Sequence, residues 1–159
     1  MAKRILIAMD ESKNAMKAVE YVADTVGKTK GVKTTLFSII PKFPPTFLET
    51  DETIHPIFKG KVGDLTALTV QKKVAIEKSM EKAKKVLMDA GIAKGNIAVK
   101  MQERKIGIAR DILKEAKEGQ YDTIAIGRRG ISATRAFLFG SVSSKVVQFA
   151  KNCTVWVVE

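Results

Sequence analysis

Five short apolar segments alternate along this chain with four stretches of helical periodicity, and this alternation constrains the fold more than any other feature. The apolar segments are short and rich in β-branched residues, which predicts strands. The expected strands are residues 3–9, 33–40, 96–101, 121–126 and 154–158. Between them, apolar residues recur every three or four positions, which predicts amphipathic helices. The expected helices are 13–28, 65–90, a segment carrying Ile108, Ile112 and Ala116, and 141–151.

Strict alternation of strand and helix predicts an α/β fold with helices on both faces of a parallel sheet. The expected architecture is a doubly wound five-stranded parallel sheet with strand order 3-2-1-4-5. The spacing of the segments does not force this order; the doubly wound fold supplies it. In that order the first and fourth strands are neighbours, and a crevice opens at their C-terminal ends. Asp10 and Gly127, which end these two strands, would then face the same crevice.

Length and composition agree with one globular domain spanning residues 1–159. Apolar runs stay well below the roughly 20 residues of a membrane-spanning helix. The N-terminus leads straight into a strand, without the longer apolar stretch of a signal peptide. The single cysteine cannot form an internal disulfide, so the chain needs no oxidising compartment. These features predict a cytoplasmic protein that does not enter membranes.

The chain is strongly basic, with 28 lysines and arginines against 17 acidic residues and a net charge of +11. Such a charge can indicate a nucleic-acid partner. Much of the excess, however, lies on the helix expected over 65–90, where six lysines between residues 72 and 85 flank an apolar stripe. Lysines opposite a core stripe are interpreted as solvent-facing residues. No nucleic-acid motif accompanies them, so specific nucleic-acid binding is not expected.

The connection after the fourth strand carries the clearest functional pattern. Gly127, Gly130 and Gly140 lie in it, and Ser141 and Ser143 follow where the next helix is expected to begin. Glycine lets the main chain approach a ligand closely, and a helix N-terminus presents unpaired N–H groups and a partial positive charge. The pattern predicts a phosphate cradle. The alternative is that the glycines serve only the turn.

The spacing Gly-x2-Gly-x9-Gly-Ser resembles the nucleotide-binding signature of the universal stress proteins. The resemblance extends to residues 3–10, which are similar to that family's opening strand with its acidic tip, and to residues 153–158, which are similar to its closing strand. It covers the chain apart from residues 42–64. The resemblance implies ATP or another adenine nucleotide as the ligand, with Mg or Mn as an accompanying ion.

The resemblance also implies a role for each residue of the expected site. The glycine loop and the two serines would hold the phosphates, with the loop arginines offsetting their charge. The acid at the tip of the first strand would accept a ribose hydroxyl or help to hold the cation, and apolar residues would surround base and sugar. The candidate binding residues are Ala8, Asp10, Ile39, Ile126, Gly127, Arg129, Gly130, Gly140, Ser141, Val142 and Ser143.

Some polar residues of the expected site and its surroundings have alternative roles that involve no ligand. Asp10 could cap the first helix together with Ser12. Arg128 and Arg129 are expected to be solvent-exposed, as arginines usually are. Cys153 is interpreted as a small buried apolar residue and not as a nucleophile.

Residues 42–64 are expected to form a long irregular connection, because Pro41 and the pair Pro44-Pro45 end the second strand. Long connections are usually functional, as a lid or a contact surface. The final strand, 154–158, is apolar on both faces and would lie at the edge of the sheet. An open apolar edge invites pairing with another chain. Together with the dimer that the family resemblance implies, this predicts a homodimer formed through Val155–Val158.

Catalysis is expected to be absent or limited to slow ATP hydrolysis, and no catalytic residue is assigned. Gly60-Lys61-Val62 lacks the hydroxyl and the spacing of a Walker motif. The favoured hypothesis is a nucleotide-binding regulatory or stress-response module. The alternatives are an interaction module of the same fold without tight nucleotide binding, and a basic nucleic-acid-associated protein.

Overall fold

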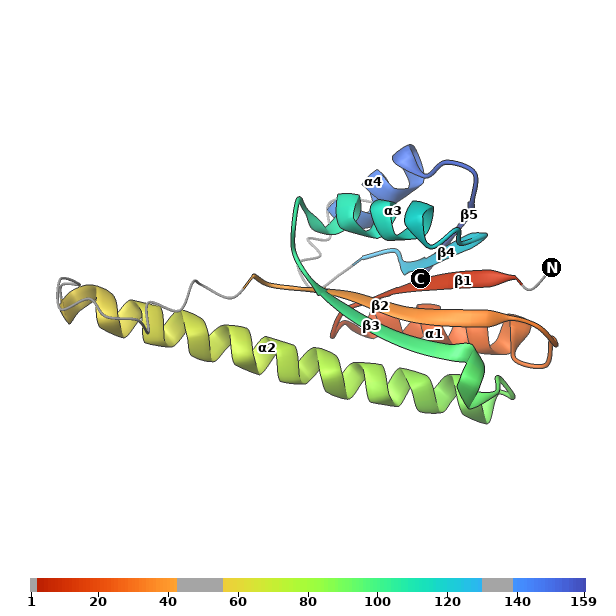
Figure 1. Cartoon of the computed structure of the whole chain (residues 1–159), viewed down its shortest axis with the longest axis horizontal. Coiled ribbons are helices and arrows are strands. Elements are labelled where there is room, and N and C mark those ends of the chain that lie inside the picture. The colour runs from red at the N-terminus through yellow and green to blue at the C-terminus, as the bar shows by residue number, and fades with distance from the viewer. Residues whose placement is uncertain (1–2, 43–55, 130–138) are drawn as a thin grey trace.

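A five-stranded parallel sheet lies at the centre of the molecule (Figure 1). The structure is a computed structural model that describes residues 3–42, 56–129 and 139–159; for residues 56–62 it describes the backbone alone. The strand order is β3-β2-β1-β4-β5, which confirms the predicted doubly wound architecture. The strands are β1 (Arg4–Met9), β2 (Lys33–Ile40), β3 (Ile97–Glu103), β4 (Thr123–Gly127) and β5 (Thr154–Val158).

Helices cover both faces of this sheet, as the alternating pattern predicted. Within the described residues they are α1 (Lys13–Val26), α2 (Pro56–Asp89), the short η1 (Lys94–Asn96), α3 (Ile108–Glu118) and α4 (Ser141–Phe149). Helices α1 and α2 lie on one face, and α3 and α4 lie on the other (Figure 1).

The two faces take alternate residues of each strand, as a pleated strand requires. In β1, Ile5 and Ile7 are buried in the core beneath α1 and α2, whereas Leu6 and Ala8 are buried beneath α3 and α4. Residues 6 to 8 of β1 pair with residues 124 to 126 of β4 in register. The C-terminal ends of these central strands therefore lie side by side, at the position where the crevice was expected.

The expected irregular connection 42–64 is wrong in its second half, because α2 already begins at Pro56. Gly60 and Gly63 obscure this start, since each glycine costs about 1 kcal/mol in a helix interior. Pro56, in contrast, occupies the first helical position, where proline is favoured. With 34 residues, α2 is about 51 Å long at 1.5 Å per residue. Its N-terminal part projects beyond the C-terminal ends of the central strands (Figure 1).

Helix α4 differs from its expected packing at one end. Val142, Val146 and Phe149 recur at helical spacing, which is typical of a single buried face. Val146 is fully buried, yet Phe149 is 62% exposed. The helix ends at Phe149, and none of the described elements covers its ring.

In the part of the chain that the structure describes, no helix combines the length and apolar character needed to cross a membrane.

Candidate functional site

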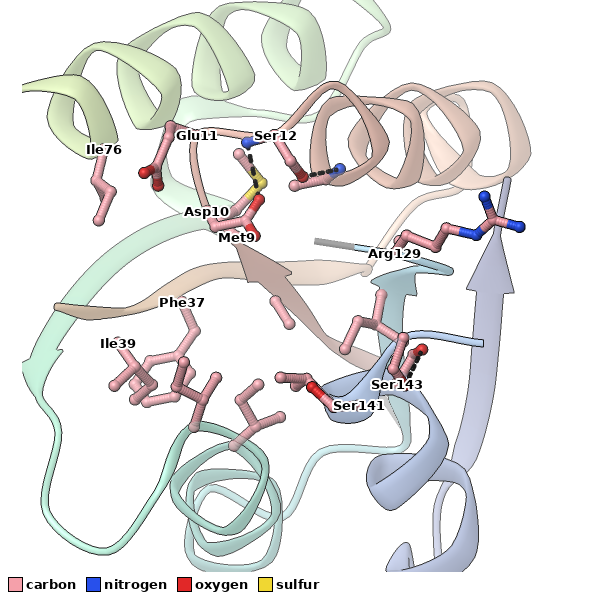
Figure 2. Close-up of a pocket in the computed structure, with 18 of the residues that line it drawn as sticks. Met9, Asp10, Glu11, Ser12, Phe37, Ile39, Ile76, Arg129, Ser141 and Ser143 are labelled. Carbon is pink, nitrogen blue, oxygen red and sulfur yellow. Dashed lines mark hydrogen bonds between the residues drawn. The ribbon is translucent and has the colours of Figure 1, made fainter. Parts of the chain in front are cut away.

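A pocket of about 700 Å³ opens at the C-terminal ends of β1 and β4 (Figure 2). Ten of the eleven candidate residues line it, so the structure brings together almost the whole set predicted from the sequence. Gly130 is the eleventh and lies outside the described residues. The ten are Ala8, Asp10, Ile39, Ile126, Gly127, Arg129, Gly140, Ser141, Val142 and Ser143.

One side of the pocket is an apolar slot. Phe37 and Ile39 come from the end of β2, and Ile108 and Ile112 come from the start of α3. Ile76 of α2 also lines the pocket, but it is 1% exposed and belongs to the core on the α1 and α2 face of the sheet, whereas Phe37 and Ile39 lie on the α3 and α4 face. Of these five residues, the sequence analysis had selected only Ile39.

The turn between β1 and α1 places Asp10 at the pocket. Ser12 is the N-cap of α1, and its Oγ accepts the N–H of Ala15 at 3.1 Å. Asp10 Oδ1 accepts the N–H of Ser12 at 2.8 Å. Ser12 therefore caps α1, as the alternative interpretation proposed. Asp10 does not cap the helix but fixes the turn before it with one carboxylate oxygen. Its Oδ2 has no hydrogen bond to a described residue and is available to a ligand.

The N-terminus of α4 faces the pocket with three N–H donors that have no acceptor among the described residues. The first hydrogen bond within the helix runs from the N–H of Ser144 to the carbonyl of Gly140 at 3.0 Å. The N–H groups of Ser141, Val142 and Ser143 precede that bond and have no partner within α4. These donors and the helix dipole suit an anion.

The serine hydroxyls at this end of α4 are not equivalent. Ser143 is buried, and its Oγ donates to the carbonyl of Arg128 at 2.6 Å. The same carbonyl accepts the N–H of Gly140 at 2.9 Å. The hydroxyl of Ser143 thus fixes the loop and is not free for a phosphate, whereas Ser141 is exposed at the pocket.

Gly127 and Gly140 both lie close to neighbouring backbone, and the contact is tighter at Gly127. A Cβ on Gly127 would lie 2.6 Å from the carbonyl carbon and oxygen of Asn14. A Cβ on Gly140 would lie 3.1 Å from the carbonyl oxygen of Arg128. Both purposes that the sequence analysis weighed for these glycines are therefore compatible, because the same close contacts build the loop.

The two loop arginines are half-buried, which corrects the expectation that they are exposed. The guanidinium of Arg128 pairs with Glu159. The backbone N–H of Arg128 donates to the carbonyl of Val158 at 2.6 Å. Arg128 is held against β5 and away from the pocket. Arg129 is among the lining residues, but its guanidinium extends away from the interior of the pocket (Figure 2), and its Nε is buried without a partner among the described residues. A buried donor of this kind is costly unless a ligand accepts from it.

Two charged residues of the pocket were missed from the sequence. Lys72 of α2 is exposed, as its interpretation as a solvent-facing residue requires, but it also lines the pocket, and its Nζ lies 3.9 Å from Glu11 Oε1. Glu11 follows Asp10 and had received no role. Only the packing of α2 over the β1–α1 turn brings these residues together, so no local sequence pattern indicates the pair.

The connection before α3 is fixed by one buried carboxylate. Asp111 is 1% exposed, and its side chain accepts the N–H groups of Lys105, Ile106 and Gly107 at 2.9 to 3.4 Å. This places Ile108 at the apolar slot.

Elsewhere, Cys153 is only half-buried, and this burial still raises the pKa of its thiol above the ordinary value. A raised pKa leaves less thiolate near neutral pH, consistent with its interpretation as an unreactive residue.

Comparison with known proteins agrees with this geometry. Residues 1–159 match the universal stress protein family. A curated universal stress protein from Synechocystis is 30% identical over 158 residues, covering 99% of this chain and 86% of the relative. The universal stress protein UspA from Lactobacillus plantarum superposes with a TM-score of 0.72 at 19% identity, covering 99% of this chain and 98% of that one. A universal stress protein from Archaeoglobus fulgidus, solved in complex with dAMP, has a TM-score of 0.63 at 17% identity and full coverage of both chains. From the family match over its whole length and the shared fold, this chain belongs to the universal stress protein family.

Proposed function

We propose that this protein is an adenine-nucleotide-binding regulatory module of the stress-response type. The observation that carries the proposal is the pocket at β1 and β4, which joins an apolar slot to an anion-binding helix end. A nucleotide has the same division into a flat base and a charged phosphate chain. ATP is the favoured ligand, because the three backbone N–H groups at the start of α4 offer several donors to phosphate oxygens.

Relatives of the same fold support an adenine base. One structural neighbour is described as a complex with dAMP, another as a complex with cAMP, and a protein from Arabidopsis thaliana as having AMP bound. In this chain the base would lie against Ile39 in the apolar slot. The ribose would lie at Asp10, and the phosphates at Gly140, Ser141 and Arg129.

A divalent cation, Mg²⁺ or Mn²⁺, fits this site only together with the nucleotide. Among the described residues, no group of three side chains of the metal-binding types is gathered to hold an ion. Asp10 Oδ2 would supply one carboxylate oxygen, and phosphate oxygens would supply others, as is usual for Mg²⁺. The cation would neutralise phosphate charge. With no assigned catalytic base, hydrolysis of ATP is expected to be slow at most.

The proposal is tested by asking what the purified protein carries. The protein is denatured, and the released small molecules are identified by mass spectrometry. An adenine nucleotide in near-stoichiometric amount is the expected result. Where none co-purifies, titration calorimetry with ATP, with and without EDTA, measures binding directly. Absence of binding in both experiments would favour an interaction module that has lost the nucleotide.

Two further properties belong to the same proposal. The protein would act in the cytoplasm, and it would form a homodimer through the open edge of β5.

A further inference from the structure

Glu11 lines the pocket and has a buried carboxylate oxygen for which the described residues provide no donor. Its Oε1 faces Lys72 Nζ at 3.9 Å. Its Oε2 is buried and accepts no hydrogen bond from any described residue. Figure 2 shows Glu11 near Ile76, on the same side of the pocket as Asp10 and across from Phe37 and Ile39. Because a buried unpaired acceptor is costly, this oxygen indicates a donor that comes with the ligand.

The neighbouring charges restrict what that donor can be. A second cation is disfavoured, since the ammonium group of Lys72 already lies beside the carboxylate. A phosphate is excluded as a partner, because its oxygens are acceptors of the same sign. A neutral O–H or N–H group remains.

The adjacent residue favours a sugar hydroxyl over a base amine. Asp10 gives Oδ1 to the N–H of Ser12 and keeps Oδ2 for a ligand. Asp10 and Glu11 are thus consecutive residues of one turn, each with one carboxylate oxygen to offer at one pocket. Two neighbouring acceptors match two neighbouring hydroxyl donors, which is the arrangement in a vicinal diol.

We propose that Glu11 is a second sugar-binding residue, which accepts one ribose hydroxyl while Asp10 accepts the other. Lys72 positions the Glu11 carboxylate from α2. The inference rests on the proposed nucleotide function and adds a specificity to it: the pocket selects ribonucleotides over deoxyribonucleotides.

The test compares three nucleotides on two proteins by titration calorimetry. Wild type and Glu11→Met are titrated with ATP, 2′-deoxy-ATP and 3′-deoxy-ATP. Wild type is expected to prefer ATP over each of the two deoxynucleotides by roughly 10- to 100-fold, the effect of one hydrogen bond to a charged group. In Glu11→Met the preference over one of the two deoxynucleotides should fall to within about 2-fold, while the preference that depends on Asp10 remains. The ratio of the affinity for ATP to the affinity for each deoxynucleotide is decisive, because removing the negative charge of Glu11 changes the repulsion of the phosphates equally for all three ligands.

Neighbouring variants control for indirect effects. Lys72→Met should lower the same ratio, because the carboxylate loses its positioning partner. Lys73→Met removes an equal charge one residue along α2, at a side chain that pairs with Glu77 and does not line the pocket, so it should leave the ratio unchanged. Glu11→Gln keeps one acceptor oxygen and should retain part of the preference. It also provides the test if Glu11→Met does not fold in an unliganded melt.

The possible outcomes distinguish a failure of the sugar contact at Glu11 from a failure of nucleotide binding itself. Equal binding of all three nucleotides by wild type, or an unchanged ratio in Glu11→Met, overturns the role of Glu11 and leaves nucleotide binding intact. Inosine triphosphate, which lacks the exocyclic amine, is titrated as a fourth ligand. If Glu11→Met changes only the preference for ATP over inosine triphosphate, Glu11 lies at the base and the sugar contact is equally overturned. Failure of wild type to bind any nucleotide overturns both proposals.

Discussion

Asp10 serves the turn and the proposed ligand with different oxygens, so its two contributions can be separated. Asp10→Ala removes both, and Asp10→Asn keeps an acceptor for the N–H of Ser12 while losing the charge. Asp10→Ala is expected to weaken ATP binding about 10- to 100-fold, because a hydrogen bond to a charged group contributes roughly 1.5–3 kcal/mol. Calorimetric titration measures this loss.

The asparagine variant serves as the control for the turn. Its unliganded melting temperature should stay near that of wild type, while its ATP affinity falls. Unchanged affinity together with a large loss of unliganded stability in Asp10→Ala would mean that Asp10 only fixes the turn before α1.

The packing around Gly127 leaves no room for a side chain, and the resulting cost in stability can be measured on the unliganded protein. An added Cβ would lie 2.6 Å from the backbone of Asn14 in the first turn of α1. Gly127→Ala should therefore destabilise the protein by about 1–3 kcal/mol, the usual cost of overpacking. Denaturant unfolding of the unliganded protein gives this value.

Gly95→Ala is the matched control, because its Cβ would meet nothing within 4 Å. It should be close to neutral. Equal stability of the two variants would show that the first turn of α1 yields readily at Asn14.

At the level of single residues, the sequence predicted which positions reach the pocket better than what each side chain does there. The positions follow from strand ends and glycine spacing, both of which are local patterns. The hydroxyl of Ser143 is instead occupied by the carbonyl of Arg128. The pair Lys72–Glu11 forms only when α2 packs over the β1–α1 turn. Such contacts depend on tertiary packing and leave no mark in a local pattern.

Among the secondary structure elements, the connection between β3 and α3 depends on a single side chain. Asp111 accepts three backbone N–H groups while it is itself buried. Asp111→Ala leaves those donors without their acceptor, and the expected loss of stability is on the order of 3 kcal/mol. Denaturant unfolding measures it. Nucleotide affinity should fall as well, since this connection leads into Ile108 at the pocket.

Asp89→Ala removes an acid from an exposed ion pair with Lys85 and provides the comparison. An exposed pair of this kind contributes at most about 1 kcal/mol. If both variants were equally stable, the hydrogen bonds to Asp111 would have no stabilising role.

The strands were predictable because their apolar runs are short, and the helices because their periodicity is regular. Helix α2 shows the limit of this approach. Gly60 and Gly63 argue locally for a loop, whereas the structure continues the helix through them from Pro56. Phe149 shows the same limit in reverse, since correct periodicity did not ensure that a neighbour covers its ring.

At the scale of the whole molecule, β5 lies at one edge of the sheet. The N–H of Thr154 donates to Asp122, and the carbonyl of Val158 accepts from Arg128. Successive residues of a strand point their backbone groups to opposite sides. The backbone groups of Val155 and Val157 are therefore directed away from β4, toward the open edge, where a second copy could pair.

Wild type is expected to be a homodimer, with about twice the mass of one chain in light scattering at micromolar concentration. Val157→Pro removes a donor at the open edge but none that faces β4, so it should give a folded monomer. Val158→Pro, which affects the side facing β4, should instead lower the melting temperature. A monomeric wild type would contradict the assembly.

Arg128 joins the two ends of this arrangement. Its carbonyl holds Gly140 and Ser143 at the pocket, while its N–H and guanidinium hold Val158 and Glu159 of the edge region. Arg128 thus contacts both the loop where a ligand would bind and the edge strand where a second copy would pair. Thermodynamic linkage makes any coupling between the two sites through this residue reciprocal. If an occupied pocket tightens the association of two chains by some factor, association must tighten ligand binding by the same factor, so cellular protein concentration would itself tune the response to nucleotide.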